Sequence, residues 1–252
     1  MHRFTFITML NELLSIGEAA KLLGVSIDTL RRWDSAGRLT SVRSGPRGHR
    51  FYRQSDIDKY LQEIDVIARN WVEAINPLEP ESDAYSQTRD VFQSRLEQFQ
   101  LKLSHIASLD AVSLITAVSG EIGNNSFDHN LGNWPDIPGI YFSYAIRNRK
   151  VVLADRGQGI LTTLKRVRTE LTSSSEALKV AFTETLSGRY PESRGNGLKF
   201  VRSIIVNNPF SLYFQTGDAD LCLKYGDNDV IVHQAKTFVR GCLVVISFEG
   251  LL

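Results

Sequence analysis

Apolar residues recur every three or four positions in a short segment near the N-terminus, SIGEAAKLLG (15–24). This spacing predicts a helix with one buried side. Ser15 and Glu18 stand three residues apart at its start, as in a capping box, where each side chain accepts a hydrogen bond from the backbone of the other residue. Gly24 is the residue type that most often ends a helix in the left-handed conformation. We therefore expect a helix that begins after Ser15 and ends at Gly24.

A second apolar repeat follows at once in SIDTLRRWD (26–34), where Ile27, Leu30 and Trp33 share one side of a helix. Ser26 precedes this helix as its cap. Two short helices joined by a tight turn form a helix-turn-helix. The chain then passes a turn at SGPRG and continues into HRFYR, which predicts a β-hairpin with a basic tip, that is, a wing.

The net charge of the chain is only +1, but its distribution is uneven. Between residues 31 and 53, seven arginines stand against one acid, Asp34, so this segment carries a charge of +6. A basic stripe confined to one small region is typical of a nucleic-acid site. The alternative is that the arginines only solubilise a small protein-binding module.

The segments SIGEAAKLLGVSIDTLRRWDSAGRL and RGHRFYRQSDIDKYL resemble the winged-helix DNA-binding domain of the MerR and excisionase families. The resemblance implies a domain at residues 1–65, whose second helix enters the major groove of double-stranded DNA and whose wing grips the backbone. It also implies a homodimer, because such modules bind paired half-sites. The candidate DNA contacts are Ser26, Thr29, Arg31 and Arg32 on the helix, and Arg43, Arg47, His49, Arg50 and Tyr52 on the wing.

The next segment, residues 66–100, has no single pattern. It mixes one amphipathic turn with Pro77, Pro80 and several acids, and then enters a helical repeat that runs over residues 85–108. We expect a helical linker here. The repeat is too short to decide between a dimer seam and a helix that packs on the following domain.

From residue 111 the pattern predicts helix, strands and glycine turns in a fixed order. Glu121, Asn125 and His129 in AVSLITAVSGEIGNNSFDHN lie four apart, so they line one polar side of a helix. IYFSYAIRNRKVVLAD reads as two strands that end at Asp155, and DRGQGI follows. SRGNGLKFVRSII then opens a second helix after a Gly-x-Gly turn, and the C-terminal residues supply further strands. The whole chain is therefore α+β.

This ordered set resembles the Bergerat-fold ATPases of the GHKL group, which include gyrase, sensor histidine kinases and mismatch-repair ATPases. The resemblance implies an α/β-sandwich ATP-binding domain at residues 101–252. In it, Asn125 would bind Mg²⁺, Asp155 would accept the amino group of adenine, and the second glycine turn would hold phosphate. Cys242 departs from the family, which often has a threonine near the adenine. The implied ATP-binding residues are Asn125, His129, Asp155, Gly157, Gly159, Ile160, Arg194, Gly195, Gly197 and Leu198.

The same resemblance leaves the reaction open. Glu121, four residues before Asn125, corresponds to the glutamate that activates water in the gyrase branch and is the candidate catalytic residue. Small kinases of this fold instead phosphorylate an STAS-like protein partner, and a pseudo-ATPase would bind ATP without turnover. Without ATP, Asn125 could hydrogen-bond locally and Asp155 could simply end a strand.

Composition narrows the setting. The two cysteines, Cys222 and Cys242, have no paired spacing, which fits a reducing cytoplasm, and no apolar run reaches the length of a membrane span. We therefore expect a cytoplasmic DNA-binding regulator that responds to ATP and Mg²⁺, with a protein kinase as the alternative.

Overall fold

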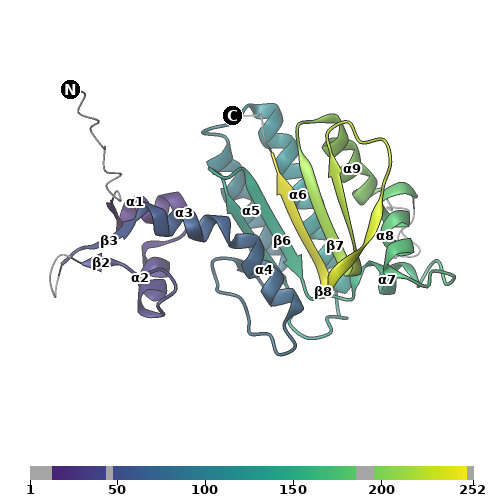
Figure 1. Cartoon of the computed structure of the whole chain (residues 1–252), viewed down its shortest axis with the longest axis horizontal. Coiled ribbons are helices and arrows are strands. Elements are labelled where there is room, and N and C mark those ends of the chain that lie inside the picture. The colour runs from purple at the N-terminus through teal and green to yellow at the C-terminus, as the bar shows by residue number, and fades with distance from the viewer. Residues whose placement is uncertain (1–12, 44–47, 186–195, 249–252) are drawn as a thin grey trace, which may run out of the picture. The chain divides into compact units, whose positions relative to one another are not determined.

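The computed structural model describes residues 13–43, 48–185 and 196–248, and the chain forms two compact units, Met1–Glu63 and Ile64–Leu252 (Figure 1). Both combine helices with antiparallel sheet. The boundary falls two residues before the end of the domain that the sequence predicted at 1–65. No helix in the described parts has the length and apolar character that a membrane crossing requires.

The first unit is a helix-turn-helix with a three-stranded sheet. Its helices are α1 (Ile16–Leu23), α2 (Ile27–Ser35) and α3 (Gln54–Gln62), and its strands β1 (Leu13–Ser15), β2 (Val42–Arg43) and β3 (Arg50–Arg53) pair in the order β1-β3-β2. The capping box of Ser15 and Glu18 is present, Gly24 ends α1 with a φ of 73°, and Ser26 caps α2. These local predictions are confirmed. Residues 44–47, at the turn between β2 and β3, lie outside the described residues.

Leu30 and Trp33 lie in the core of this unit, as the repeat predicted. Ile27 does not, because 41% of it is exposed. Ile27 is the first residue of α2, and the buried residues of this helix begin only at Thr29.

The second unit is built on a five-stranded antiparallel sheet in the order β4-β5-β6-β8-β7. The strands are β4 (Tyr85–Ser86), β5 (Ile140–Ala145), β6 (Lys150–Asp155), β7 (Ser211–Lys224) and β8 (Val232–Ser247). The register of β7 against β8 shifts at Gly217, which re-aims the side chains of the outer part of this long hairpin. Asp155 is the last residue of the central strand β6.

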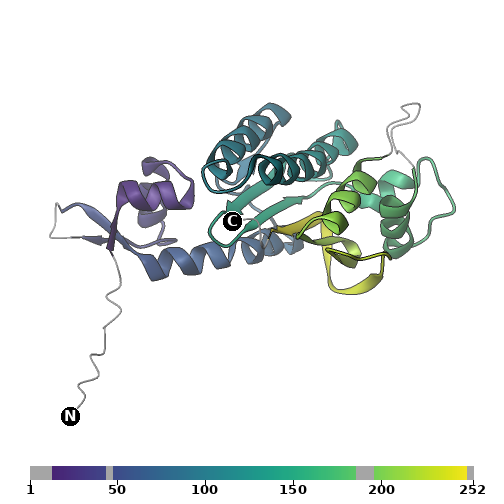
Figure 2. The ribbon, with the colours of Figure 1, turned by 90° about the horizontal axis from the view of Figure 1, so that it is seen from above.

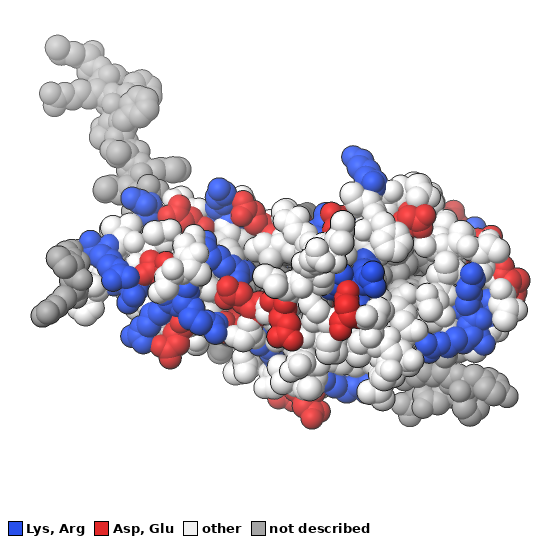
Figure 3. All heavy atoms as spheres, turned by 90° about the horizontal axis from the view of Figure 1, so that it is seen from below, with Lys and Arg blue, Asp and Glu red and all other residues white. Residues whose placement is uncertain are grey.

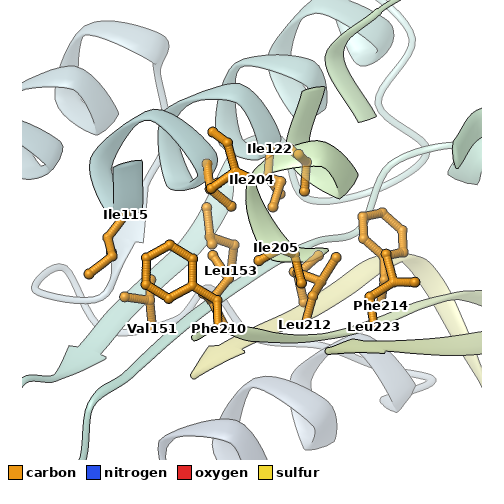
Figure 4. Packing of buried hydrophobic residues seen from close by; sticks show 14 of the residues in the cluster. Ile115, Ile122, Val151, Leu153, Ile204, Ile205, Phe210, Leu212, Phe214 and Leu223 are labelled. Atoms are coloured by element: carbon orange, nitrogen blue, oxygen red, sulfur yellow. The ribbon is translucent and has the colours of Figure 1, made fainter. Parts of the chain in front are cut away.

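Helices lie on both faces of this sheet (Figure 2). One face packs against α5 (Arg89–Leu103), α6 (Leu109–Asn130), α8 (Ser174–Thr183) and α9 (Gly197–Asn207), with the short α7 (Gly159–Leu164) beside α8. Figure 4 shows the core on this face, where the apolar side chains of α6, α9, β6 and β7 converge. The opposite face carries α4 (Ile64–Glu73).

The expected linker at 66–100 belongs to the second unit instead. Ala68 and Trp71 of α4 are buried against the sheet, and Phe92 and Phe99 of α5 enter the core under α6. Most of the apolar positions that left a dimer seam open in the sequence, namely Phe92, Leu96, Phe99 and Leu103, are therefore covered within the unit itself, whereas Val91 is exposed.

Candidate functional sites

The end of β6 holds a buried carboxylate. Asp155 is 3% exposed, and Ser126 of α6 donates a hydrogen bond to its Oδ2 at 2.8 Å. The backbone N–H of Gly157 donates to Oδ1, also at 2.8 Å. Burial raises the pKa of Asp155 to about 6, against the opposing effect of these hydrogen bonds. A buried carboxyl group whose hydrogen-bond donors are uncharged is a candidate for binding a polar ligand group.

The polar side of α6 meets the start of α9. Asn125 donates from Nδ2 to Oε1 of Glu121 at 3.2 Å. A Cβ added at Gly197 would lie 1.9 Å from that same Oε1 and 3.0 Å from the Asn125 amide nitrogen, so a larger residue there would displace the Glu121 carboxylate. The unpaired backbone N–H groups at the start of a helix favour anions. No side chain caps the first turn of α9. This turn lies next to Glu121 and Asn125.

Asn130, at the end of α6, is a site residue that sequence reasoning missed. It is 4% exposed, its Oδ1 accepts from the backbone N–H of Gln158 at 2.8 Å, and its Nδ2 donates to the carbonyl of Ser126 at 2.7 Å. A Cβ on Gly157 would stand 2.1 Å from that amide. Asn130 therefore shapes the glycine turn. Its spacing of four residues from Ser126 was a usable signal, because it puts both side chains on the side of α6 that faces β6.

Thr216 of β7 was also missed. Its hydroxyl accepts from the backbone N–H of Ile160 at 3.2 Å and donates to the carbonyl of Gly241 at 2.9 Å. It pairs across the sheet with Cys242, whose thiol is buried and has a pKa well above its ordinary value because of that burial. No signal in the sequence pointed to Thr216, because the pairing depends on the register of a long hairpin.

The remaining predicted residues are distributed as follows. Gly159 opens α7, and Ile160 and Leu198 pack partly buried against the core. The carbonyl of His129 accepts a hydrogen bond from Gln158 at 3.2 Å. Arg194 and Gly195 lie outside the described residues. The structure thus brings Glu121, Asn125 and Gly197 together. Asp155 and Gly157 lie beside them, next to Ser126, which follows Asn125 on α6.

The basic residues of the first unit divide into two groups, and the first is exposed. Arg31, Arg32 and His49 are at the surface, and Arg31 pairs with Asp28 at 2.7 Å. Ser26 is exposed but already accepts the N–H of Thr29 at 3.0 Å. In the first unit, acids lie among the Lys and Arg side chains on the face seen in Figure 3.

The second group holds the wing. Arg50 and Arg43 donate to the Asp34 carboxylate at 2.7 and 2.9 Å. Burial opposes ionisation of Asp34, but these hydrogen bonds and one from the backbone of Ser41 hold its pKa well below the usual range. Arg43 and Arg50 therefore tie both wing strands to α2. Arg47 lies outside the described residues.

Two predicted DNA contacts are corrected by the structure. Thr29 is 2% exposed and its hydroxyl hydrogen-bonds that of Ser26 at 2.8 Å. Tyr52 is fully buried and donates to the carbonyl of Leu30 at 3.0 Å. Both were candidates because the resemblance to the MerR domain places them on its second helix and wing, but their side chains are buried within the unit.

Comparison with known proteins decides the type of the first unit. Residues 15–52 match the family model of the MerR family regulatory proteins. The MerR-type helix-turn-helix predicted for this unit is therefore confirmed, and this fold is that of a DNA-binding regulator. The chain is also 40% identical over 65 residues to a type II methyltransferase, M.Eco47II from Escherichia coli. That match covers 26% of this chain and 16% of the methyltransferase, so the chain spans only a small part of that relative.

Proposed function

We propose that the chain is a DNA-binding regulator whose second unit binds ATP with Mg²⁺ and so controls the MerR-type helix-turn-helix. The observation that carries the proposal is the buried carboxyl of Asp155 beside the turn at Gly157, with Asn125 and Glu121 against the start of α9. This is the order and arrangement expected of a Bergerat-type ATP site on an α/β sandwich.

Asp155 is suited to an adenine amino group. A carboxylate accepts a hydrogen bond from that group and repels the carbonyl that guanine presents at the same edge. The Thr216 hydroxyl supports this assignment, since it lies opposite Cys242 and supplies from β7 the hydroxyl that related ATPases carry as a threonine. Gly157 allows the backbone to approach the base closely.

Asn125 is suited to Mg²⁺, which prefers oxygen ligands and completes its shell with phosphate and water. The first turn of α9 at Gly197 would hold the phosphates, with Leu198 next to it in that turn and His129 on α6, four residues after Asn125. Glu121 would act as the base for a water molecule.

A structural route from this site toward the first unit begins at Arg156. This residue directly follows Asp155, is 1% exposed, and donates from Nη1 to the carbonyl of Trp71 at 2.6 Å. Trp71 lies in the last turn of α4, whose first residue follows Glu63, where the first unit ends. A movement of the loop at Asp155 therefore acts on the helix that leads into the DNA-binding unit. Binding can switch the protein only if it favours one position of this helix.

Equilibrium binding of ATP and GTP in the presence of Mg²⁺ tests the site. We expect ATP to bind at least about tenfold more tightly than GTP, and Asn125→Ala and Asp155→Asn each to weaken ATP binding by about tenfold or more. Equal affinity for the two nucleotides would contradict the role of Asp155.

The switch needs a second experiment. DNA selected from a random pool by the full chain should bind with different affinity when Mg-ATP is added, and Asn125→Ala should remove that difference. Homodimerisation is part of this proposal, and a selected site with two half-sites would support it. Transfer of labelled phosphate to an STAS-like protein would instead favour the kinase.

A further inference from the structure

A pocket of about 560 Å³ lies between α4 and the β7–β8 hairpin. It is on the face of the sheet that α4 covers, whereas Ser126, which contacts Asp155, belongs to α6. The helices α4 and α6 lie on opposite faces of the sheet (Figure 2). Leu243 and Val245 contribute an apolar floor, and Val66 of α4 borders the mouth. A volume of this size suits a small organic molecule.

The wall of the pocket is ordered by a buried amide. Gln215 is fully buried, and its Oε1 accepts from Nη1 of Arg69 at 2.8 Å and from the hydroxyl of Tyr213 at 2.7 Å. Its Nε2 donates to the carbonyl of Thr237 at 2.6 Å. Arg69 also donates from Nη2 to the Tyr213 hydroxyl at 3.2 Å. A buried amide with these three bonds fixes the guanidinium and the phenol along the wall.

The acids that line the pocket are already engaged by groups of the protein. Asp65 and Glu73 each have a cation within 3.2 Å, and Asp220 lies 3.3 Å from the Tyr213 hydroxyl and 3.8 Å from Nδ1 of His233. The two cations are Lys150 for Asp65 and Arg69 for Glu73.

The cations, by contrast, keep unused donors. Arg69 uses Nη1 for Gln215 and Glu73 and one Nη2–H for Tyr213, and its Nε–H and second Nη2–H have no partner among the described residues. Lys236 is exposed at the rim, and within the same described residues its ammonium has neither a hydrogen bond nor an ion pair. The wall therefore presents positive hydrogen-bond donors next to an apolar floor.

We propose that this pocket binds a small organic monoanion, a carboxylate with a flat apolar body. The carboxylate would lie on Arg69 and Lys236, since a guanidinium and an ammonium are the strongest partners for that group. The apolar body would cover Leu243 and Val245. The site is distinct from the proposed nucleotide site and does not depend on it.

Fluorine NMR of fluorobenzoate with the full chain tests this proposal. Fluorobenzoate should bind, and fluorobenzamide, which has the same shape without the charge, should bind about tenfold more weakly or worse. Lys236→Gln at the exposed rim should weaken fluorobenzoate binding about fivefold or more. Lys224→Gln removes the same charge at the far end of β7 and should leave the affinity unchanged. Val66→Asp places a carboxylate at the mouth and should abolish binding.

Several outcomes would overturn the proposal. They are no binding of fluorobenzoate, equal binding of the acid and the amide, and an affinity of Lys236→Gln equal to that of the parent. Displacement of fluorobenzoate by inorganic phosphate at similar concentration would show an anion site without the apolar selectivity. Displacement by Mg-ATP would place the probe in the nucleotide site, whereas retention of the probe in saturating Mg-ATP supports a separate pocket even if ATP binds elsewhere on the chain or fails to bind.

Discussion

Asp34 in the first unit and Asp155 in the second are both withdrawn from solvent, but their surroundings differ in charge. Asp34 lies between two guanidinium groups, Arg43 and Arg50, and its pKa falls. Asp155 has a hydroxyl and backbone N–H groups for partners, and burial raises its pKa to about 6. The first carboxylate stabilises the fold that presents the wing. The second is held at a cost to stability, which is the pattern expected where a ligand will supply the missing partner.

The two regions also differ in how far apart along the chain their interacting residues lie. The caps of the first unit join residues three positions apart, whereas the candidate site of the second joins α6 to β6 and α9, and α7 to β7. A compact motif is recognisable in the sequence as a whole. A site assembled by packing depends on the framework that brings its parts together. Substitutions that disturb that framework should therefore have the largest effects.

The largest effect is expected for Arg156→Met. The substitution removes a guanidinium that is 1% exposed, and with it the hydrogen bonds to Asp136 and to the Trp71 carbonyl. Asp136 keeps Arg240 at 3.5 Å. We expect the free energy of unfolding of the second unit to fall by about 2–4 kcal/mol. Amide hydrogen exchange, read separately for residues 13–43 and 64–185, measures the loss. Arg168→Met removes a more exposed cation with two acidic partners and should change exchange far less. Equal losses in both variants would show that the buried position of Arg156 is immaterial.

The next largest effect is a gain in stability, expected for Asp155→Asn. Because the pKa of Asp155 is raised from 3.8 to about 6, the folded protein binds more protons than the unfolded chain between those values. Stability therefore falls as the pH rises through this window, and the penalty is complete above about pH 6. Asp155→Asn should stabilise the ligand-free protein at neutral pH by roughly 3 kcal/mol and flatten this slope, while weakening ATP binding.

Urea unfolding followed across this pH range checks the prediction, with the exposed Asp229→Asn as a control for the change of net charge. Asp34 has the opposite sign, since its lowered pKa stabilises the fold above pH 3.8 and that stability is lost as the pH falls. If Asp155→Asn were less stable than the parent at neutral pH, the predicted contrast between Asp34 and Asp155 would be wrong.

Sequence and structure agree best where the deciding interactions are local. Ser15, Glu18 and Gly24 were predicted because caps depend on neighbours within four residues. The common face of Glu121 and Asn125 followed from helical spacing alone. Gly197 was predicted as a turn, but its contact with Glu121 could be seen only once α9 was packed on α6.

Where tertiary packing decides, sequence reasoning failed. Thr29 and Tyr52 were candidate DNA contacts because of their places on the second helix and the wing, yet both side chains are buried in the first unit. Thr216 reaches its site through the pairing of two long strands, whose register no local pattern records. The same holds for α4 and α5, which looked like a linker until the sheet provided a surface for them.

A moderate effect is expected for Tyr52→Phe, which tests the correction in the first unit. Removal of the hydroxyl leaves the Leu30 carbonyl without this donor, and we expect a loss of about 1 kcal/mol in the stability of the first unit. DNA affinity at a temperature where both proteins are folded should be unchanged, because Tyr52 is fully buried. Tyr225→Phe, at a residue that is 67% exposed, is the matched control for stability. Loss of DNA affinity without loss of stability would return Tyr52 to the DNA surface.

The smallest effect on stability belongs to Arg31→Ala. Its pair with Asp28 is exposed, with 57% and 85% of the two side chains accessible, so stability should change by less than about 0.5 kcal/mol. DNA affinity should nevertheless fall, and the slope of its logarithm against that of salt should decrease by about 1 if Arg31 neutralises one phosphate.

Two further variants distinguish arginines that hold the wing in place from arginines that contact DNA. Arg50→Ala breaks a link to Asp34 and should lose stability as well as DNA affinity. Asp28→Ala removes a negative charge and frees Arg31, so it should tighten DNA binding with little change in stability. If Arg31→Ala and Arg50→Ala instead alter stability and salt slope alike, the division between surface and wing-holding arginines fails. The first unit would then resemble the second, in which the residues that hold the fold and those that form the candidate site are interleaved.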